Sequence, residues 1–471
     1  MKSREQQIHE ASVRILARTG MKFEHPEAVE ILKAHGINVD DEGVARFTED
    51  QLMYWVNKAP HAFKIFARNP EHDITVGGDH LNPAPGYGCP FVLDSEGNRH
   101  DAKVTDYVKF AKLYHQQKSF HVNGGIIVQP NDLPVENATL LMFYMAYYYS
   151  DKAMLTGTAD GEQVKAMMDM AKAAFGGEEE FMKYPRLITL INTVTPLQLT
   201  NVMTESLFQF VRNGQPVIIG SLGQAGSTSP MTLAGSIALS NAEILAGIAF
   251  TQMVRPGAPV VYGCETTTAD MRSGATAIGA PEGAICYNQA GIMADFYGVP
   301  SRAGGCLSDA KTVNAQAGME SMLTFLACRQ ANINFMIHAA GIMDAYASMS
   351  YEKLMIDFDV IDFATQYNNR FEINEETIPE DLIDEVGQDG VYLTEDHTFE
   401  HCRESLIPDL AVRGTVEDPL HAYENNIQNK IDRMLNSYVR PETDDAIIAK
   451  MHEILAARGV DAELVKKIEN M

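Results

Sequence analysis

Short apolar runs recur along the centre of the chain, and each ends in small or polar residues before a helical stretch begins. This alternation is typical of a parallel sheet built from strand-helix units. Eight runs fit it, at residues 122–128, 153–157, 187–192, 216–221, 259–264, 301–306, 333–339 and 391–395. The pattern therefore predicts an α/β fold, and eight units favour a closed (β/α)8 TIM barrel.

The chain on either side of this alternation has a different pattern. Residues 3–58 carry apolar positions at helical spacing, and two short strand-like runs follow at 62–67 and 73–77, with a hairpin turn at 94–98. Residues 419–471 read as helices with charged faces. We predict an N-terminal helical and small mixed subdomain in residues 1–100, the barrel in 101–418 and a C-terminal helical extension in 419–471.

Charge narrows the set of partners. Lys and Arg number 37 against 63 Asp and Glu, a formal charge of −26. A field of that sign repels phosphate backbones and anionic lipid surfaces, so we expect no binding to nucleic acid or membrane. It is compatible with a cationic small molecule, although much of such charge serves solubility alone.

The cysteines and the N-terminal residues indicate the compartment. Six cysteines occur without a CxxC pair, and the chain opens on the charged stretch MKSREQQIHE. Neither feature is typical of a secreted protein. We therefore expect a cytoplasmic protein with reduced thiols. A separate prediction concerns assembly: the long helical C-terminus favours self-association into a homo-oligomer.

Polar residues that follow the predicted strands are the candidates for chemistry, because a barrel places its active site at the C-terminal ends of its strands. Glu265 follows the run PVVYGC, where a carboxylate can neutralise a cation or act as a base, so it is our candidate catalytic residue. The alternative is a structural carboxylate at a helix N-terminus. His338, at the end of INFMIH, is either a ligand for a substrate carboxylate or a core histidine. Asn192 and His397 are further candidates for substrate binding.

Aromatic side chains near the same strand ends can hold an ammonium that has no N–H to donate. The candidates are Tyr87, Phe91, Tyr262, Phe335 and Tyr346. A different hypothesis is a thiolate zinc site that combines Cys264 and Cys306 with Glu265 or His338. No metal-ligand spacing supports it in the sequence, so we predict no metal site.

Several long motifs resemble one known family. They are TSPMTLAGSIALSNAEILAG (228–247), PGAPVVYG (256–263), DMRSG (270–274), GAPE (279–282), YGVPSRAGGCLSDAK (297–311), QAGMES (316–321) and SYEKL (350–354). This set resembles the trimethylamine methyltransferase family, and the looser similarity of the N-terminal region and of HTFEHCRE (397–404) extends the resemblance over nearly the whole chain. The founding members contain pyrrolysine, which this sequence lacks. It is similar instead to members such as glycine betaine and proline betaine:corrinoid methyltransferases and their relatives that act on related betaines such as carnitine.

The resemblance implies a (β/α)8 barrel that transfers a methyl group from a quaternary amine to Co(I) of a corrinoid. It also implies that a cognate partner protein carries the corrinoid and that this chain binds no cofactor tightly. A quaternary nitrogen needs no prior activation, because it leaves as a neutral tertiary amine. Two other hypotheses remain: a metal-dependent hydrolase or lyase, and a non-catalytic betaine-binding protein.

Overall fold

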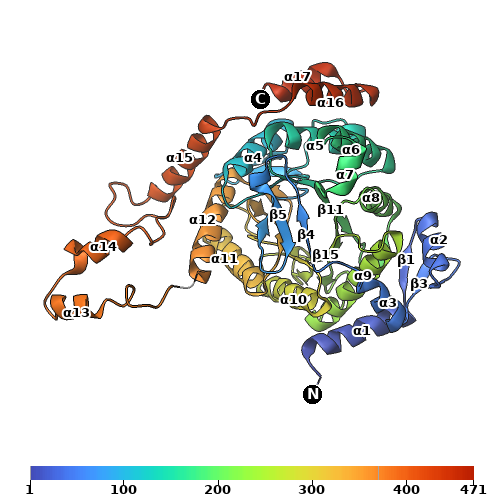
Figure 1. The fold of residues 1–471 in the computed structure, drawn as a ribbon, viewed down its shortest axis with the longest axis horizontal. Helices are drawn as coiled ribbons and strands as arrows, with labels where there is room; N and C mark the ends of the chain where they lie inside the picture. Colours follow the sequence, from blue (N-terminus) through green and yellow to red (C-terminus); the bar gives the residue numbers. More distant parts are fainter. Residues whose placement is uncertain (1, 370) are drawn as a thin grey trace.

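The computed structural model describes residues 2–369 and 371–471, and a parallel barrel lies at its centre (Figure 1). Its eight strands are hydrogen-bonded in the order β6-β19-β18-β15-β13-β11-β10-β9, and every pair is parallel. In chain order they are β6 (Asn82–Pro83), β9 (Val122–Gly124), β10 (Ala153–Thr156), β11 (Leu187–Asn192), β13 (Val217–Ser221), β15 (Val260–Cys264), β18 (Ser301–Arg302) and β19 (Phe335–Met336). The (β/α)8 prediction is confirmed.

The barrel closes between its first two strands, just beyond β6 and β9. The amide of Gly88 donates to the carbonyl of Ile126 at 2.6 Å, and Cys89 forms a parallel bridge with Val128. The predicted eighth strand at 391–395 is therefore wrong. That segment is exposed and contains a single 3-10 turn, η3 (Tyr392–Thr394), whereas β6 supplies the remaining strand from the N-terminal part of the chain.

Each barrel strand is followed by a helix on the outside. In the order of the strands above, the helices are α4 (Val104–Gln116), α5 (Ala138–Tyr149), α6 (Gly161–Ala174), α8 (Asn201–Arg212), α9 (Leu233–Val254), α10 (Pro281–Tyr297), α11 (Ala315–Gln330) and α12 (Tyr351–Asn368). Helix α9 is long and apolar enough to cross a membrane, but 83% of its most apolar window is buried inside the fold. Most of its residues are buried, which explains why its hydrophobic residues show no single face.

A small hairpin plugs the end of the barrel where the strands begin. Strands β4 (Ala62–Ile65) and β5 (Ile74–Gly77) pair antiparallel and lie across the barrel in Figure 1. Their side chains Ile65, Ile74 and Val76 form one buried cluster with interior residues of the barrel such as Leu190 and Phe335. The hairpin closes this end of the barrel interior and leaves the opposite end, where the strands finish, uncovered by it.

The remaining elements decorate the barrel. The N-terminal part contains α1 (Arg4–Arg18), α2 (Pro26–Ala34) and α3 (Glu49–Val56) with β1 (Met21–Phe23), β2 (Asn38–Val39), β3 (Val44–Arg46) and η1 (Pro70–His72). Loops at the strand ends form two small sheets, one of β14 (Gln224–Ala225), β16 (Thr267–Ala269) and β17 (Thr276–Ala277), the other of β7 (Phe91–Leu93), β8 (Arg99–Asp101), β20 (Ile342–Met343) and β21 (Ser348–Met349). Short elements complete the wall: η2 (Val135–Asn137), α7 (Glu178–Lys183) and β12 (Gln198–Leu199).

The C-terminal prediction of helices is confirmed by α15 (Ala422–Ser437), α16 (Asp445–Ala457) and α17 (Ala462–Glu469). They pack on the barrel exterior, with α16 against α5 and α6 and α15 against α4 and α12 (Figure 1). The division of the chain at residues 100 and 418 stays a prediction, and β6 shows that barrel residues begin before residue 100.

Candidate active site

Four of the predicted site residues come together where the barrel strands end. Glu265 follows β15, His338 follows β19, and Tyr87 lies just beyond β6. Tyr346, in the turn between β20 and β21, donates its hydroxyl to Oε2 of Glu265 at 2.5 Å. The ring of His338 lies 4.8 Å from that of Tyr346 and 6.4 Å from that of Tyr87, edge-on to the latter. The barrel thus joins three strand ends into one aromatic and acidic site.

Arg302 on β18 completes this site, although it was not among the residues predicted from the sequence. Its Nη1 lies 3.1 Å from Oε1 of Glu265, and both side chains are almost fully buried, at 2% and 4% exposure. A charged residue inside an apolar strand is rare unless it is paired, so the run that begins with Ser301 and Arg302 already contained the signal. The site therefore holds one buried positive and one buried negative charge side by side.

Burial sets the ionisation of these groups. It raises the pKa of Glu265, and the neighbouring Arg302 offsets part of that rise. Burial, with the charge of Arg302, holds the pKa of His338 well below its usual value, so the imidazole is neutral near pH 7. Burial raises the pKa of Tyr87 to about 12 and that of Tyr346 well above its usual value, so both hydroxyls keep their protons.

Three buried polar atoms at this site have no hydrogen-bond partner among residues 2–369 and 371–471: Oε1 of Glu265, Nε of Arg302 and Nδ1 of His338. The contact between Arg302 and Glu265 is therefore an ion pair without an aligned hydrogen bond. Unsatisfied buried polar groups are costly and uncommon in native proteins. Their convergence on one spot indicates a site whose hydrogen bonds are completed by a ligand.

The backbone at the site is strained in the manner of functional loops. His338 has a φ of +65°, and the consecutive residues Asp344, Ala345 and Tyr346 have φ values of +52°, +53° and +71°. These left-handed conformations are disfavoured for residues with a Cβ and tend to persist at binding and catalytic sites. Space is tight as well, since a Cβ on Gly304 would stand 3.0 Å from Oε2 of Glu265. Gly304 therefore leaves the carboxylate room in the site.

Two aromatic candidates lie elsewhere. Tyr262 points out of the barrel toward the helices, where its hydroxyl donates to Oδ1 of Asn241 at 2.9 Å and its ring stacks on Tyr297. Alternation along β15 explains this, because Tyr262 lies on the face opposite to Val261 and Glu265. Phe335 points inward but is fully buried in the layer below the site.

Asn192 and His397, the other two candidates for substrate binding, lie far apart in the structure. Asn192 ends β11 and is exposed at the barrel mouth, so it stays a prediction for substrate binding. His397 lies on α14 (Asp396–His401), where its ring packs on that of His401 and its Nε2 contacts the carbonyl of Glu376. The structure does not bring His397 to the site, because the run before it is not a barrel strand. The weaker candidate Phe91 has Arg99 over its ring face.

The four residues of the zinc hypothesis do not converge. Cys264, like Tyr262, faces away from the barrel interior and donates its thiol to Oγ1 of Thr266 at 3.3 Å. The carbonyl of Cys306 accepts from the buried amine of Lys353. Across the described part of the chain, no group of three or more His, Cys, Asp and Glu side chains could hold a metal ion. Nothing in the geometry favours the hydrolase or lyase hypothesis.

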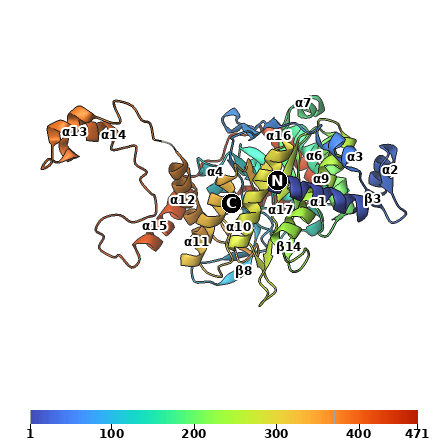
Figure 2. The ribbon, with the colours of Figure 1, turned by 90° about the horizontal axis from the view of Figure 1, so that it is seen from below.

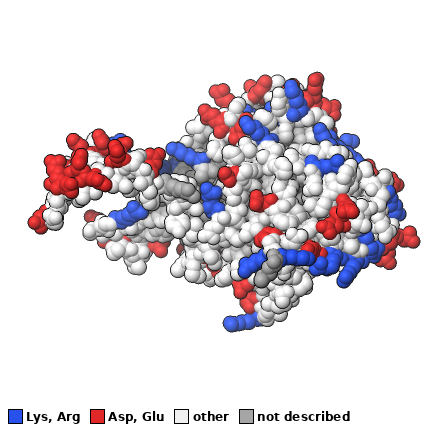
Figure 3. Space-filling view, turned by 60° about the horizontal axis from the view of Figure 1, so that its bottom comes forward, with Lys and Arg blue, Asp and Glu red and all other residues white. Residues whose placement is uncertain are grey.

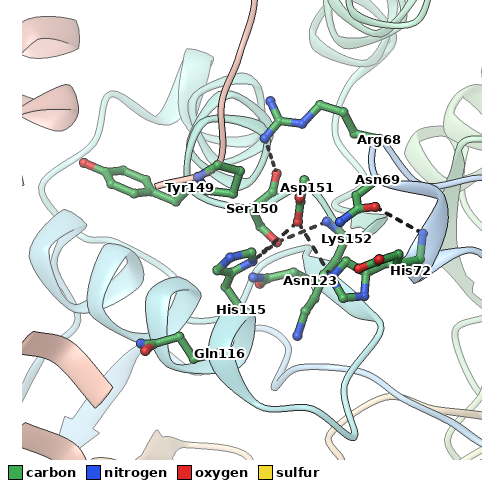
Figure 4. A network of polar contacts seen from close by, with 12 residues as sticks. Arg68, Asn69, His72, His115, Gln116, Asn123, Tyr149, Ser150, Asp151 and Lys152 are labelled. Carbon is green, nitrogen blue, oxygen red and sulfur yellow. Dashed lines mark hydrogen bonds and ion pairs between the residues drawn. The ribbon is translucent and has the colours of Figure 1, made fainter. Parts of the chain in front are cut away.

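A second cluster of titratable groups lies at the other end of the barrel, before β9 and β10 (Figure 4). The buried amine of Lys152 donates to the carbonyls of Tyr114 and Gln117, both at 2.9 Å. The carboxylate of Asp151 lies 3.7 Å from Nδ1 of His115 and 3.9 Å from Nε2 of His72. This cluster is on the far side of the hydrophobic layers from Glu265, so we assign it to stability.

Lys152 predicts a specific pH dependence of stability. Burial lowers its pKa to about 7, whereas a lysine in the unfolded chain titrates near 10.4. Between these values the unfolded chain binds more protons than the native one, so this residue makes the free energy of unfolding rise with pH by up to about 1.4 kcal/mol per unit. Lys152→Met removes that contribution. Denaturant titrations at pH 7.5 and 9.5 give the change in the free energy of unfolding between these two pH values for wild type, Lys152→Met and the exposed control Lys118→Met. The same change in all three proteins would contradict the prediction.

Fold and site together define a (β/α)8-barrel methyltransferase once the comparisons with known proteins are added. The chain belongs to the trimethylamine methyltransferase (MTTB) family, whose profile matches residues 1–462. The family prediction made from the sequence motifs is thereby confirmed.

Two of the similar proteins are named as betaine methyltransferases. The glycine betaine methyltransferase of Desulfitobacterium hafniense strain Y51 is 38% identical over 469 residues, which cover 96% of this chain and 95% of that protein. The proline betaine:corrinoid methyltransferase of Eubacterium limosum is 32% identical over 398 residues, covering 82% and 81%. Among solved structures, the monomethylamine methyltransferase of Methanosarcina barkeri in its hydroxylamine complex matches with a TM-score of 0.51 at 9% identity, over 92% of this chain and 98% of that one. That last match supports the fold alone.

Proposed function

We propose that this enzyme transfers a methyl group from a betaine, a quaternary amine that carries a carboxylate, to Co(I) of a corrinoid held by a partner protein. The observation that carries the proposal is the buried pair of Arg302 and Glu265 with unsatisfied polar atoms around it. A betaine is a zwitterion of the same charge pattern. Binding it adds no net charge to a site of low polarity, and each end finds a partner of opposite sign.

The ammonium end fits the acidic and aromatic side of the site. A trimethylammonium group has no N–H, so it is held by a carboxylate and by π faces rather than by hydrogen bonds. Glu265 supplies the charge, and the rings of Tyr346 and Tyr87 lie 4.8 Å and 6.4 Å from the ring of His338 in the same site. The hydroxyl of Tyr346 fixes the direction of the carboxylate.

The carboxylate end fits the unsatisfied donors. Nε of Arg302 has a hydrogen to donate, and Nδ1 of the neutral His338 can donate in one tautomer. Charge-assisted bonds of this kind are short and directional, so they orient the whole substrate. A tertiary amine such as trimethylamine has no carboxylate to use them, which is why we place betaines above methylamines as substrates.

The corrinoid supplies the nucleophile for the methyl carbon, and the chain must leave it access. The mouth meets that requirement, since Asn192 and the loop residues Val194, Leu222, Met231 and Met271 are all exposed there. Exposed apolar side chains around a polar pocket are typical of a surface where another protein docks. The residues of this chain bind the substrate, orient one methyl group outward and keep water from the ammonium.

A substrate panel tests the proposal. Purified enzyme is mixed with reduced cognate corrinoid protein and, in turn, glycine betaine, proline betaine, carnitine, trimethylamine and choline, and methylation of the cobalt is followed by absorbance. We expect transfer from at least one betaine and none from trimethylamine. Tight betaine binding without any transfer would instead support a non-catalytic binding protein.

A further inference from the structure

Residues 371–409 form an arm that stands away from the rest of the protein (Figures 1 and 2). It follows the barrel helix α12 and contains α13 (Glu380–Val386), η3 and α14. No residue of the arm is buried, and neither helix has a buried side chain. The arm therefore contributes no core of its own.

The arm nevertheless carries many large apolar side chains. Nine are between 42% and 84% exposed: Phe371, Ile373, Ile378, Ile383, Val391, Tyr392, Leu393, Phe399 and Ile407. Ordering such a segment costs conformational entropy that only burial of apolar surface offsets. An apolar surface of this extent marks an interaction site.

The end of the arm is fastened to the barrel. The amide of Leu410, itself fully buried, donates to Oδ2 of Asp359 on α12 at 3.1 Å. Its carbonyl accepts from Asn426 on α15 at 2.9 Å, and Asp409 pairs with Lys430 at 3.1 Å. The arm is thus held at a fixed base and directed away from its own barrel.

Charge restricts what can cover the arm. It contains 13 acidic residues and one basic residue, Arg403, a formal charge of 1 − 13 = −12, and its tip is densely acidic in Figure 3. A complementary surface must combine basic and apolar side chains. The position of the arm restricts its partner further. Figure 2 shows α13 and α14 out to one side and level with one end of the barrel, whereas the mouth-side strands β8 and β14 lie at the opposite end. A protein docked at the mouth does not cover the arm.

Helices α10 and α1 provide such a surface on this same chain. Ile285, Ile292 and Phe296 form an exposed apolar stripe at helical spacing along α10. The ring of Phe296 lies 5.8 Å from that of His9 on α1. The basic side chains come from α1, whose exposed face carries Arg4, Arg14 and Arg18, with Arg14 3.9 Å from Glu10, while α10 itself exposes Glu282 and Asp295. A cavity of about 580 Å³, lined in part by Ile292, opens beside the stripe and is large enough for an aromatic side chain.

We propose that the arm of one copy covers the stripe on α10 and the basic face of α1 of a second copy. The contact is reciprocal: each copy covers the other with its arm, so two copies related by a two-fold axis bury both arms. The arm of each copy places its apolar side chains on the stripe and its carboxylates opposite the arginines of α1. This interface is independent of the barrel mouth and leaves it free for the corrinoid protein.

Cys402 allows a direct test, because it lies on the arm and is the one exposed cysteine of the six. A photo-crosslinker is attached to Cys402 of full-length protein, and ¹⁵N-labelled and unlabelled protein are mixed, unfolded, refolded together and irradiated. We expect crosslinked peptides that join the arm of one isotope to α10 or α1 of the other. Crosslinks that join only peptides of the same isotope overturn the proposal.

Two substitutions on opposite sides of the interface provide a second test. Phe399→Asp on the arm and Ile285→Asp on α10 are each expected to reduce the mass in solution to that of the 52.0 kDa chain. Val439→Asp, at an equally exposed apolar residue outside both surfaces, is the matched control and keeps the wild-type mass. A monomeric wild-type protein, or variants that keep its assembly, overturn the proposal. Retained methyl transfer in the variants shows that they are folded.

Discussion

Replacing Glu265 with glutamine lowers kcat/KM for methyl transfer from a betaine by about 10²-fold. The substitution removes the negative charge that faces the ammonium and leaves Arg302 buried without a partner. Breaking one side of a buried charge arrangement costs about 3 kcal/mol or more, and 1.4 kcal/mol corresponds to a factor of ten. Initial rates of cobalt methylation over a range of betaine concentrations give the value.

His397→Ala is the matched control for Glu265→Gln. His397 was also a candidate from the sequence, but it lies on the exposed arm, so the variant should retain the wild-type rate. The pH profile gives a second readout. Because burial raises the pKa of Glu265, activity should fall on the acid side as the carboxyl group gains a proton, and Glu265→Gln should lack that fall. A variant as active as wild type would exclude Glu265 from the site.

Arg302→Lys is expected to raise KM for glycine betaine by about 30-fold and to change kcat much less. Lysine keeps the positive charge beside Glu265 but loses the planar donor set that matches a carboxylate, a difference of about 2 kcal/mol. Binding of betaine by calorimetry measures the loss directly. The thermal stability of the variant is the control for folding, because Arg302 is buried.

Choline separates this role from a general effect on the pocket. It has the same trimethylammonium group and no carboxylate, so its weak binding should be equal in wild type and Arg302→Lys. A variant that loses affinity for choline and glycine betaine to the same degree would show that Arg302 does not bind the carboxylate.

Seven of the eight barrel strands could be predicted from the sequence, because strands buried on both faces read as short apolar runs. Strand β6 could not, since it consists of Asn82 and Pro83 and has no apolar run. The segment 391–395 has the composition of a strand but lies on the exposed arm. We assign its apolar residues to the contact with a second copy. The local sequence pattern does not distinguish such a contact segment from a buried strand.

Position at a strand end predicts which residues the barrel brings to its mouth. Glu265 and His338 lie there as that position predicts. The direction of a side chain was harder, as Tyr262 shows, because it depends on which residues of β15 face inward. Arg302 was not predicted, because it lies within a strand and strand-end position points only to residues that follow one.

The most direct measurement of the central claim is a single turnover with methyl-labelled betaine. Enzyme, reduced corrinoid protein and glycine betaine labelled with ¹³C in all three N-methyl groups are mixed, and the methylated cobalt and dimethylglycine are quantified by mass spectrometry. We predict one labelled methyl group on the cobalt for each dimethylglycine formed, and neither product with Glu265→Gln on the same time scale. Label that stays in intact betaine while the wild-type enzyme binds it would show that the protein is not a betaine:corrinoid methyltransferase.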